Sequence, residues 1–178
     1  MATILSETPA PVAEMQPAAE EKPRHVAFIC SKGSLDMAYP ALIMGWAALG
    51  NGIDVTIFFT FWGLDLITKK RQDKLQISPI GNTSMKMGDM GIPNIVSVLP
   101  GMTAMATNMM KKQMNALQVP PVSEYLQMLV DGGAKLYACK MSVDMMGLKM
   151  EDFVEGVDSI VTASDFMDMT EGAQIIFI

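Results

Sequence analysis

Two short apolar segments with one helical segment between them constrain the fold more than any other feature of this chain. Residues 25–30 (HVAFIC) and 53–60 (IDVTIFFT) are rich in β-branched and aromatic residues, which favour strands. Between them, apolar residues recur at helical spacing from Leu35 to Leu49, and residues 50–52 (GNG) form a stop. Strand, helix and strand in this order predict a crossover unit with a parallel sheet.

The rest of the chain continues this alternation. We predict further strands at residues 95–99, 134–139, 159–162 and 174–178, the last of them at an edge of the sheet. We predict helices or helical turns at residues 62–68, 102–117, 123–130, 141–146, 150–155 and 164–170, the last of them capped by Ser164. Residues 85–93 contain three Met and two Gly without a period and are expected to form a mobile loop. The predicted fold class is α/β, with an open, mainly parallel sheet of about five strands.

Length and composition indicate one domain in a reducing compartment. Residues 1–22 are dominated by Ala, Pro, Glu and Thr and are predicted to be a disordered tail, followed by a single domain at residues 23–178. Two cysteines in 178 residues do not resemble a secreted disulfide framework, so we expect a soluble, cytoplasmic protein. No apolar run is long enough to span a membrane. A net charge of −6 disfavours nucleic acid as a partner.

The two cysteines occupy the same kind of position. Cys30 and Cys139 each end an apolar segment and precede a polar turn and a helix. Because the carboxyl ends of parallel strands lie along one edge of a sheet, both thiols are expected at that edge, where ligands bind. A nearby helix start, with Lys32 and Lys140 close in sequence, is expected to favour the thiolate. The alternative is that both cysteines are small buried packing residues.

Other residues are weaker candidates for the same crevice. Ser31 and Lys32 belong to a turn whose backbone amides could hold an anion, and Trp62 follows the second predicted strand, where it could form a wall. Lys140 and Asp144 follow Cys139 and could line the crevice or lie on the surface. No G-x-G-x-x-G or G-x-x-x-x-G-K-[ST] motif is present.

Metal and triad chemistry are not expected. The acidic residues at positions 151–171 resemble a solvated face. The 19 Met residues lack supporting His or Cys and are expected to fill the core or contact partners. His25, the only histidine, begins a strand at the edge opposite the cysteines, so a Ser-His-Asp or Cys-His arrangement would lack its base. No metal or cofactor is predicted.

Four motifs in residues 23–178 resemble the DsrE/DsrF-like family, in its soluble branch often labelled peroxiredoxin-like. They are the cysteine that ends the first strand, F-F-T-F-W-G-L at residues 58–64, M-x-x-M-G-I-P-N at residues 87–94, and Y-A-C-x-M-S-x-D-x-M-G at residues 137–147. The resemblance implies a parallel α/β fold, a homo-oligomer, and a sulfur relay in which a cysteine carries a persulfide between rhodanese-like and TusA-like proteins.

Carried over to this sequence, the resemblance implies that Cys139 is the main sulfur carrier and Cys30 its helper or a second acceptor. The membrane helices of some relatives are not matched here, and no T-x-x-C peroxidatic motif supports the peroxiredoxin label. The first functional hypothesis is therefore a sulfur carrier with sulfurtransferase-like chemistry. Two alternatives stay open, a non-catalytic oligomeric binding or scaffold protein and a thiol-dependent oxidoreductase.

Overall fold

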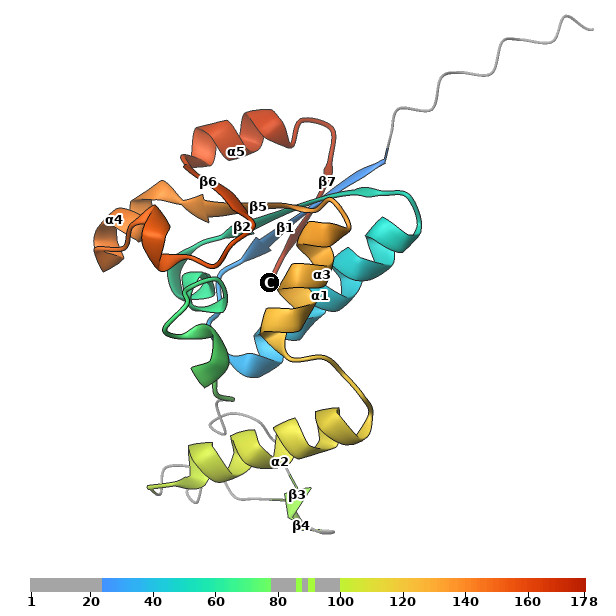
Figure 1. The fold of residues 1–178 in the computed structure, drawn as a ribbon, viewed down its shortest axis with the longest axis vertical. Coiled ribbons are helices and arrows are strands. Elements are labelled where there is room, and N and C mark those ends of the chain that lie inside the picture. The colour runs from blue at the N-terminus through green and yellow to red at the C-terminus, as the bar shows by residue number, and fades with distance from the viewer. Residues whose placement is uncertain (1–23, 78–85, 88–89, 92–99) are drawn as a thin grey trace, which may run out of the picture.

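A five-stranded parallel sheet forms the centre of the molecule (Figure 1). The computed structural model describes residues 24–77, 86–87, 90–91 and 100–178. The strand order is β6-β5-β2-β1-β7, so β2 lies in the middle. The strands are β1 (His25–Cys30), β2 (Asp54–Phe59), β5 (Lys135–Cys139), β6 (Val157–Val161) and β7 (Gln174–Phe177).

Helices connect the strands and cover both faces of the sheet (Figure 1). The α-helices are α1 (Leu35–Gly50), α2 (Met102–Ala116), α3 (Val122–Asp131), α4 (Lys140–Met146) and α5 (Ala163–Met169). Three 3₁₀ helices also lie in the described residues: η1 (Phe61–Leu66), η2 (Gln72–Lys74) and η4 (Met150–Asp152). The predicted α/β class with an open parallel sheet is therefore confirmed.

The direction of the connections explains why the helices divide between two faces. From β1 the chain steps to β2, β5 and β6 in one direction across the sheet, and it then returns past all of them to place β7 beside β1. Crossover connections between parallel strands are almost always right-handed. When the chain reverses its direction across the sheet, the connecting helix therefore moves to the opposite face. Helix α5, which makes the return, accordingly lies opposite α1 and α3 (Figure 1).

Side chains of the strands alternate between two cores. In β1, Phe28 and Cys30 belong to the larger core beneath α1 and α3, whereas Ala27 belongs to the smaller core beneath α5. The smaller core is centred on Phe58 and Phe166, whose rings stack with their centroids 4.5 Å apart. Because strand side chains point to alternate faces, a residue's register decides which core it enters.

The predicted elements agree with the structure at most positions, with two differences. Thr162, not Ser164, caps α5, because the Thr162 hydroxyl accepts a hydrogen bond from the Asp165 N–H at 3.2 Å. Within the expected loop at residues 85–93, Lys86–Met87 (β3) and Met90–Gly91 (β4) pair as antiparallel strands. Two-residue strands are too short to produce a period in the sequence. The strand predicted at residues 95–99 lies outside the described residues, as does the predicted tail.

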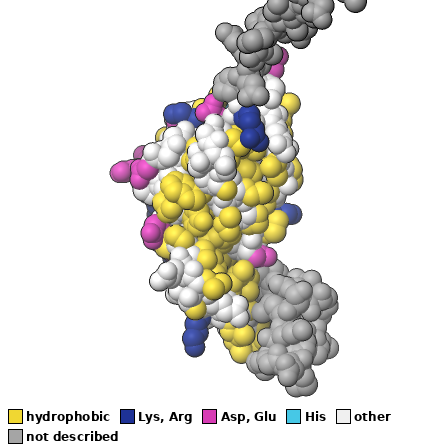
Figure 2. All heavy atoms as spheres, turned by 90° about the vertical axis from the view of Figure 1, so that its right-hand side faces the viewer, with side chains coloured by type: hydrophobic (Ala, Val, Ile, Leu, Met, Phe, Trp, Pro, Cys, Tyr) yellow, Lys and Arg dark blue, Asp and Glu magenta, His cyan; other side chains and the backbone are white. Residues whose placement is uncertain are grey.

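The outer face of α1 exposes apolar side chains. Ile43, Met44 and Trp46 are each exposed, and α1 carries no charged residue after Asp36 that would make this face polar. Figure 2 views the molecule from this side and shows hydrophobic side chains gathered over it. A contiguous apolar surface of this kind is typical of a contact with another protein. No helix in the described part of the chain is both long and apolar enough to cross a bilayer.

A substitution at Gly63 tests how closely η1 packs against the sheet. A Cβ atom at Gly63 would lie 2.0 Å from the carbonyl oxygen of Cys30, so only glycine fits between η1 and the end of β1. We expect Gly63→Ala to lower the free energy of unfolding by about 3 kcal/mol, measured by denaturant titration. Gly50→Ala is the control, because a Cβ there has nothing within 4 Å. Equal stability of the two variants would contradict the close packing.

Candidate active site around Cys139

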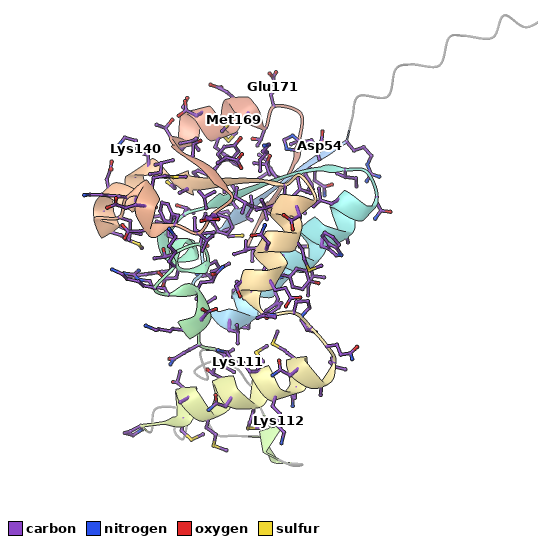
Figure 3. All side chains as sticks on the ribbon, viewed as in Figure 1. Asp54, Lys111, Lys112, Lys140, Met169 and Glu171 are labelled. Carbon is purple, nitrogen blue, oxygen red and sulfur yellow. The ribbon has the colours of Figure 1, made fainter. Side chains whose placement is uncertain are left out.

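Cys139 lies where a strand changes directly into a helix. It is the last residue of β5 and the N-cap of α4, with no connecting residue between the two elements. In Figure 3, Lys140 marks this carboxyl edge of the sheet, and Asp54, at the start of β2, marks the amino edge on the other side. The expected placement of Cys139 at the carboxyl edge is therefore confirmed.

Ser142 joins the ends of two neighbouring strands beside this thiol. Its side chain is completely buried, and its Oγ accepts a hydrogen bond from the Phe61 N–H at 2.9 Å. The Ser142 and Thr60 hydroxyls are hydrogen-bonded at 3.1 Å. Since Thr60 follows β2 and Ser142 lies in the first turn of α4, this group fixes the start of α4 against the end of β2.

Opposing effects set the pKa of the Cys139 thiol. Burial, the largest single effect, acts to raise this pKa, but several hydrogen bonds act to lower it. The hydrogen-bonding groups are the backbone and hydroxyl of Ser142, the Thr60 hydroxyl and the Met141 backbone. Together they outweigh burial and lower the pKa of Cys139 below its ordinary value. The thiolate is the nucleophilic form of cysteine, so this environment favours reactivity.

Phe61 holds an unusual backbone conformation next to this group. Its φ is 46°, in the left-handed region that a bulky residue rarely adopts. The strain is offset by the Phe61 N–H bond to Ser142 and by the bond from the Gly63 N–H to the Thr60 carbonyl at 2.9 Å. Residues held in such conformations are concentrated at functional sites. Here the conformation turns the chain so that Thr60 and Ser142 meet beside Cys139.

Cys30 differs from Cys139 in its electrostatics. It is 2% exposed and belongs to the core beneath α1. Burial raises the pKa of Cys30 to about 12, so the expectation that a nearby helix favours its thiolate is wrong. Unlike Cys139, which α4 follows at once, Cys30 is separated from α1 by residues 31–34. The helix start is too far away to offset the apolar surroundings.

The two sulfur atoms lie at one edge of the sheet but on different faces. Cys30 belongs to the core under α1, and Cys139 to the core under α5. Strand β2 separates them, since Cys30 pairs with Phe59 and Phe59 pairs with Ala138. Two strand spacings amount to about 10 Å, beyond the roughly 7 Å between Cα atoms that a disulfide can bridge. A bond between them within this chain would need the sheet to rearrange.

The weaker candidates divide between three places. The Ser31 hydroxyl donates a hydrogen bond to the Ile178 carbonyl at 3.0 Å and so ties β1 to the end of β7. Lys32 and Trp62 line a shared cavity. The Lys140 ammonium pairs with the Asp144 carboxylate at 2.9 Å on the surface of α4. The nearby charge expected from Lys140 is therefore directed to Asp144, and hydrogen bonds lower the Cys139 pKa instead.

Sequence reasoning missed Ser142 and Thr60. The available signal was a C-x-x-S spacing across the start of a helix, which brings residues 139 and 142 to one turn. The position of Thr60 depends on β2 and β5 being neighbours, which the sequence does not reveal.

His25 lies at the amino edge, with its Nε2 2.9 Å from the Thr56 hydroxyl. Within the described ranges, no group of three or more His, Cys, Asp or Glu is placed to hold a metal ion.

Comparison with known proteins identifies the family. The model of the DsrE/DsrF/DrsH-like family matches residues 22–178. The chain belongs to this family. It is also 37% identical over 146 residues to the sulfur carrier protein DsrE2 of Allochromatium vinosum, covering 80% of this chain and 91% of that protein. The uncharacterized protein YrkE of Bacillus subtilis is 26% identical over 158 residues, covering 89% of this chain and 99% of YrkE.

Solved structures give more distant matches. A protein of unknown function, MTH1491 from Methanobacterium thermoautotrophicum, matches 87% of this chain and 99% of its own, with a TM-score of 0.48 and 12% identity. The ychN protein of E. coli matches 88% of this chain and 100% of its own, with a TM-score of 0.49 and 11% identity. The assignment to the DsrE/DsrF/DrsH-like family therefore rests on the sequence matches.

The lowered pKa of Cys139 predicts an unusual alkylation profile. Because the thiolate reacts, a lowered pKa moves the rise in reaction rate to lower pH than for an ordinary cysteine, whose pKa is about 8.5. We expect this shift for Cys139 with iodoacetamide, measured by peptide mass spectrometry across pH. Ser142→Ala removes one hydroxyl donor and should return the profile toward higher pH.

Ser164→Ala is the matched control, because Ser164 is exposed on α5. Its profile should equal that of the unmodified protein. Cys30 should remain unlabelled until the protein unfolds, since its thiol is buried and its pKa is about 12. Labelling of both cysteines at one rate and one pH would contradict this description of the site.

Proposed function

We propose that this protein carries sulfur as a persulfide on Cys139 and transfers it between protein partners. The observation that carries the proposal is the Cys139 thiol, whose pKa is lowered by hydrogen bonds at the carboxyl edge of the sheet. The name of its relative in Allochromatium vinosum, a sulfur carrier protein, supports the same function. The proposed location is the cytoplasm, because a chain with two free cysteines suits a reducing compartment.

The proposed reaction is an exchange between sulfur atoms. The Cys139 thiolate attacks the terminal sulfur of a donor persulfide, a new S–S bond forms, and the donor's S–S bond breaks. The donor leaves as a thiolate and takes up a proton, so no net oxidation occurs. In the second half-reaction, an acceptor thiolate attacks the terminal sulfur on Cys139 and regenerates the Cys139 thiolate. The protein acts as a sulfurtransferase-like carrier and needs neither metal nor organic cofactor.

The hydrogen-bond donors around Cys139 serve both half-reactions. They stabilise the attacking thiolate in the first, and they stabilise the same thiolate as the leaving group in the second. A leaving thiol with a lower pKa departs faster. Ser142 and Thr60 are therefore proposed as positioning residues that tune Cys139 without reacting themselves.

Transfer between proteins requires a surface next to the thiol. Cys139 is only 4% exposed, so the exchange requires it to become more accessible than in this structure. Exposed apolar side chains flank the site: Phe61 and Trp62 begin η1, and Met141 and Met145 lie one turn apart on α4. Aromatic and Met side chains are typical of adaptable protein contacts. We propose that this aromatic and Met surface receives rhodanese-like and TusA-like proteins, the partners implied by the family resemblance.

The apolar face of α1 is proposed to bury itself in a homo-oligomer. Its exposed residues, Ile43, Met44 and Trp46, lie on a different element from the Cys139 surface. Both contacts can therefore be occupied at once.

Cys30 is proposed to be a packing residue in place of the helper role implied by the resemblance, because its burial and high pKa oppose reaction. A reductase that forms a Cys30–Cys139 disulfide is disfavoured by their separation across β2.

A loading experiment tests the proposal. Incubating the purified protein with a persulfide donor, such as a loaded rhodanese, should add the mass of one sulfur atom to the peptide that contains Cys139. The added mass should disappear on reduction and should transfer to an acceptor thiol. Cys139→Ala should abolish loading, because the remaining thiol, Cys30, is buried and its pKa is raised to about 12.

Cys30→Ala is the matched control because it removes the other thiol. It should leave loading of Cys139 unchanged while lowering the free energy of unfolding by about 1 kcal/mol or more, since it leaves a cavity in the core. Absence of any sulfur adduct on Cys139, or loading that is lost in Cys30→Ala and kept in Cys139→Ala, would contradict the proposed function.

A further inference from the structure

A cavity of about 590 Å³ lies beside η1, and neither Ser142 nor Cys139 lines it. The loop after β1, η1 and the segment around η2 surround it, and Thr103 of α2 completes the wall. Leu75 and Ile77 supply apolar surface, and Trp62, which is 61% exposed, also lines the cavity. This volume is within the range of sites for small organic ligands, roughly 300–1,000 Å³.

Positive charge converges on this cavity in an otherwise acidic protein. Lys32, Arg71 and Lys74 line it together with one carboxylate, Asp65, although the whole chain has a net charge of −6. The Arg71 guanidinium pairs with Asp65 at 2.6 Å, which fixes both side chains. Among the described residues, neither Lys32 nor Lys74 takes part in an ion pair. The two ammonium groups are therefore available to an anion.

Neighbouring elements extend this positive region. Lys111 reaches across from α2, where Figure 3 labels it, to donate a hydrogen bond to the Asp73 carbonyl at 3.3 Å. The Lys69 ammonium is directed elsewhere, to the Glu151 carbonyl of η4 at 3.0 Å. Acidic residues are concentrated instead in residues 151–171, on η4, β6 and α5. The positive side chains at the cavity raise the local concentration of anions there.

The loop after β1 is shaped to close one side of the cavity. A Cβ at Gly33 would lie 2.5 Å from the Trp62 carbonyl oxygen, so glycine lets the loop approach η1. Ser34 occupies the N-cap position of α1, yet its side chain makes no capping hydrogen bond. Its hydroxyl, which also lines the cavity, is therefore available to a ligand.

We propose that this cavity binds a phosphorylated small molecule with a flat ring, of the nucleoside phosphate class. The Lys32 and Lys74 ammonium groups and the Ser34 hydroxyl bind the phosphate, and the exposed Trp62 ring stacks on the flat ring. A small ligand fits better than nucleic acid, because the charge is confined to a cavity on a chain with net charge −6. The cavity shares only Trp62 with the aromatic and Met surface beside Cys139, and binding of a phosphorylated ligand goes beyond the proposed sulfur transfer.

Titration with ADP tests the site directly. We expect saturable binding by calorimetry, with quenching of tryptophan fluorescence that Trp62→Leu removes. The double variant Lys32→Gln, Lys74→Gln should weaken binding at least about tenfold, a loss of about 1.4 kcal/mol. Adenosine and inorganic phosphate, each lacking half of the proposed contacts, should bind more weakly than ADP. Circular dichroism checks that the exposed substitutions leave the fold intact.

Lys135→Gln is the matched control, because Lys135 lies at the start of β5 on the amino edge. It should bind ADP like the unmodified protein. Absence of saturable ADP binding, an equal loss in the control variant, or phosphate binding as tightly as ADP would overturn the proposal. Sulfur loading of Cys139 is measured on the Lys32→Gln, Lys74→Gln variant, whose substitutions lie outside the aromatic and Met surface, so failure at the cavity is distinguishable from failure of the proposed function.

Discussion

The hydrogen bonds of the buried Ser142 hydroxyl hold together the parts of the candidate site. They join the residues that follow β2 to the first turn of α4, and they do so beside the only thiol whose pKa is lowered among the described cysteines. A buried hydroxyl without partners costs free energy, so the ends of β2 and β5 must keep their relative positions. The reactivity of Cys139 is in this sense a property of the sheet edge.

The two cysteines show how the same sequence setting produces different chemistry. Each ends a strand, but Cys30 faces the larger core and Cys139 the smaller one. The decisive difference is the distance to the following helix. Helix α4 begins at once after Cys139, so backbone N–H groups of its first turn reach the sulfur, whereas a loop intervenes after Cys30. Burial without such donors makes a thiol inert.

The sequence predicts the fold well because its local signals agree with one another. Apolar segments such as residues 25–30 and the helical period after Leu35 place the strands and helices within a few residues of their observed bounds. The prediction of Ser164 as the cap of α5 is wrong by two residues, because a second hydroxyl residue lies just before it and backbone geometry selects Thr162. The position of Cys139 at the sheet edge also follows from the sequence.

The rest of the site depends on contacts distant in sequence. Strand order decides that β2 lies between the cysteines and that Thr60 meets Ser142, and no local pattern encodes that order. The difference in pKa between Cys30 and Cys139 depends on burial and on individual hydrogen bonds. The cavity beside Trp62 is likewise formed by segments that the sequence treats as a turn and a polar connection.

The direct junction between β5 and α4 limits how the molecule can respond to an extra atom. No residue separates the strand from the helix at Cys139, so the backbone has no loop there with which to move aside. If Cys139 carries sulfur as proposed, neighbouring side chains, such as those of Phe58 and Phe166 in the small core, must make room for the second atom. Empty and loaded molecules would then differ in the packing around this thiol, which would give a donor and an acceptor a way to distinguish the two states.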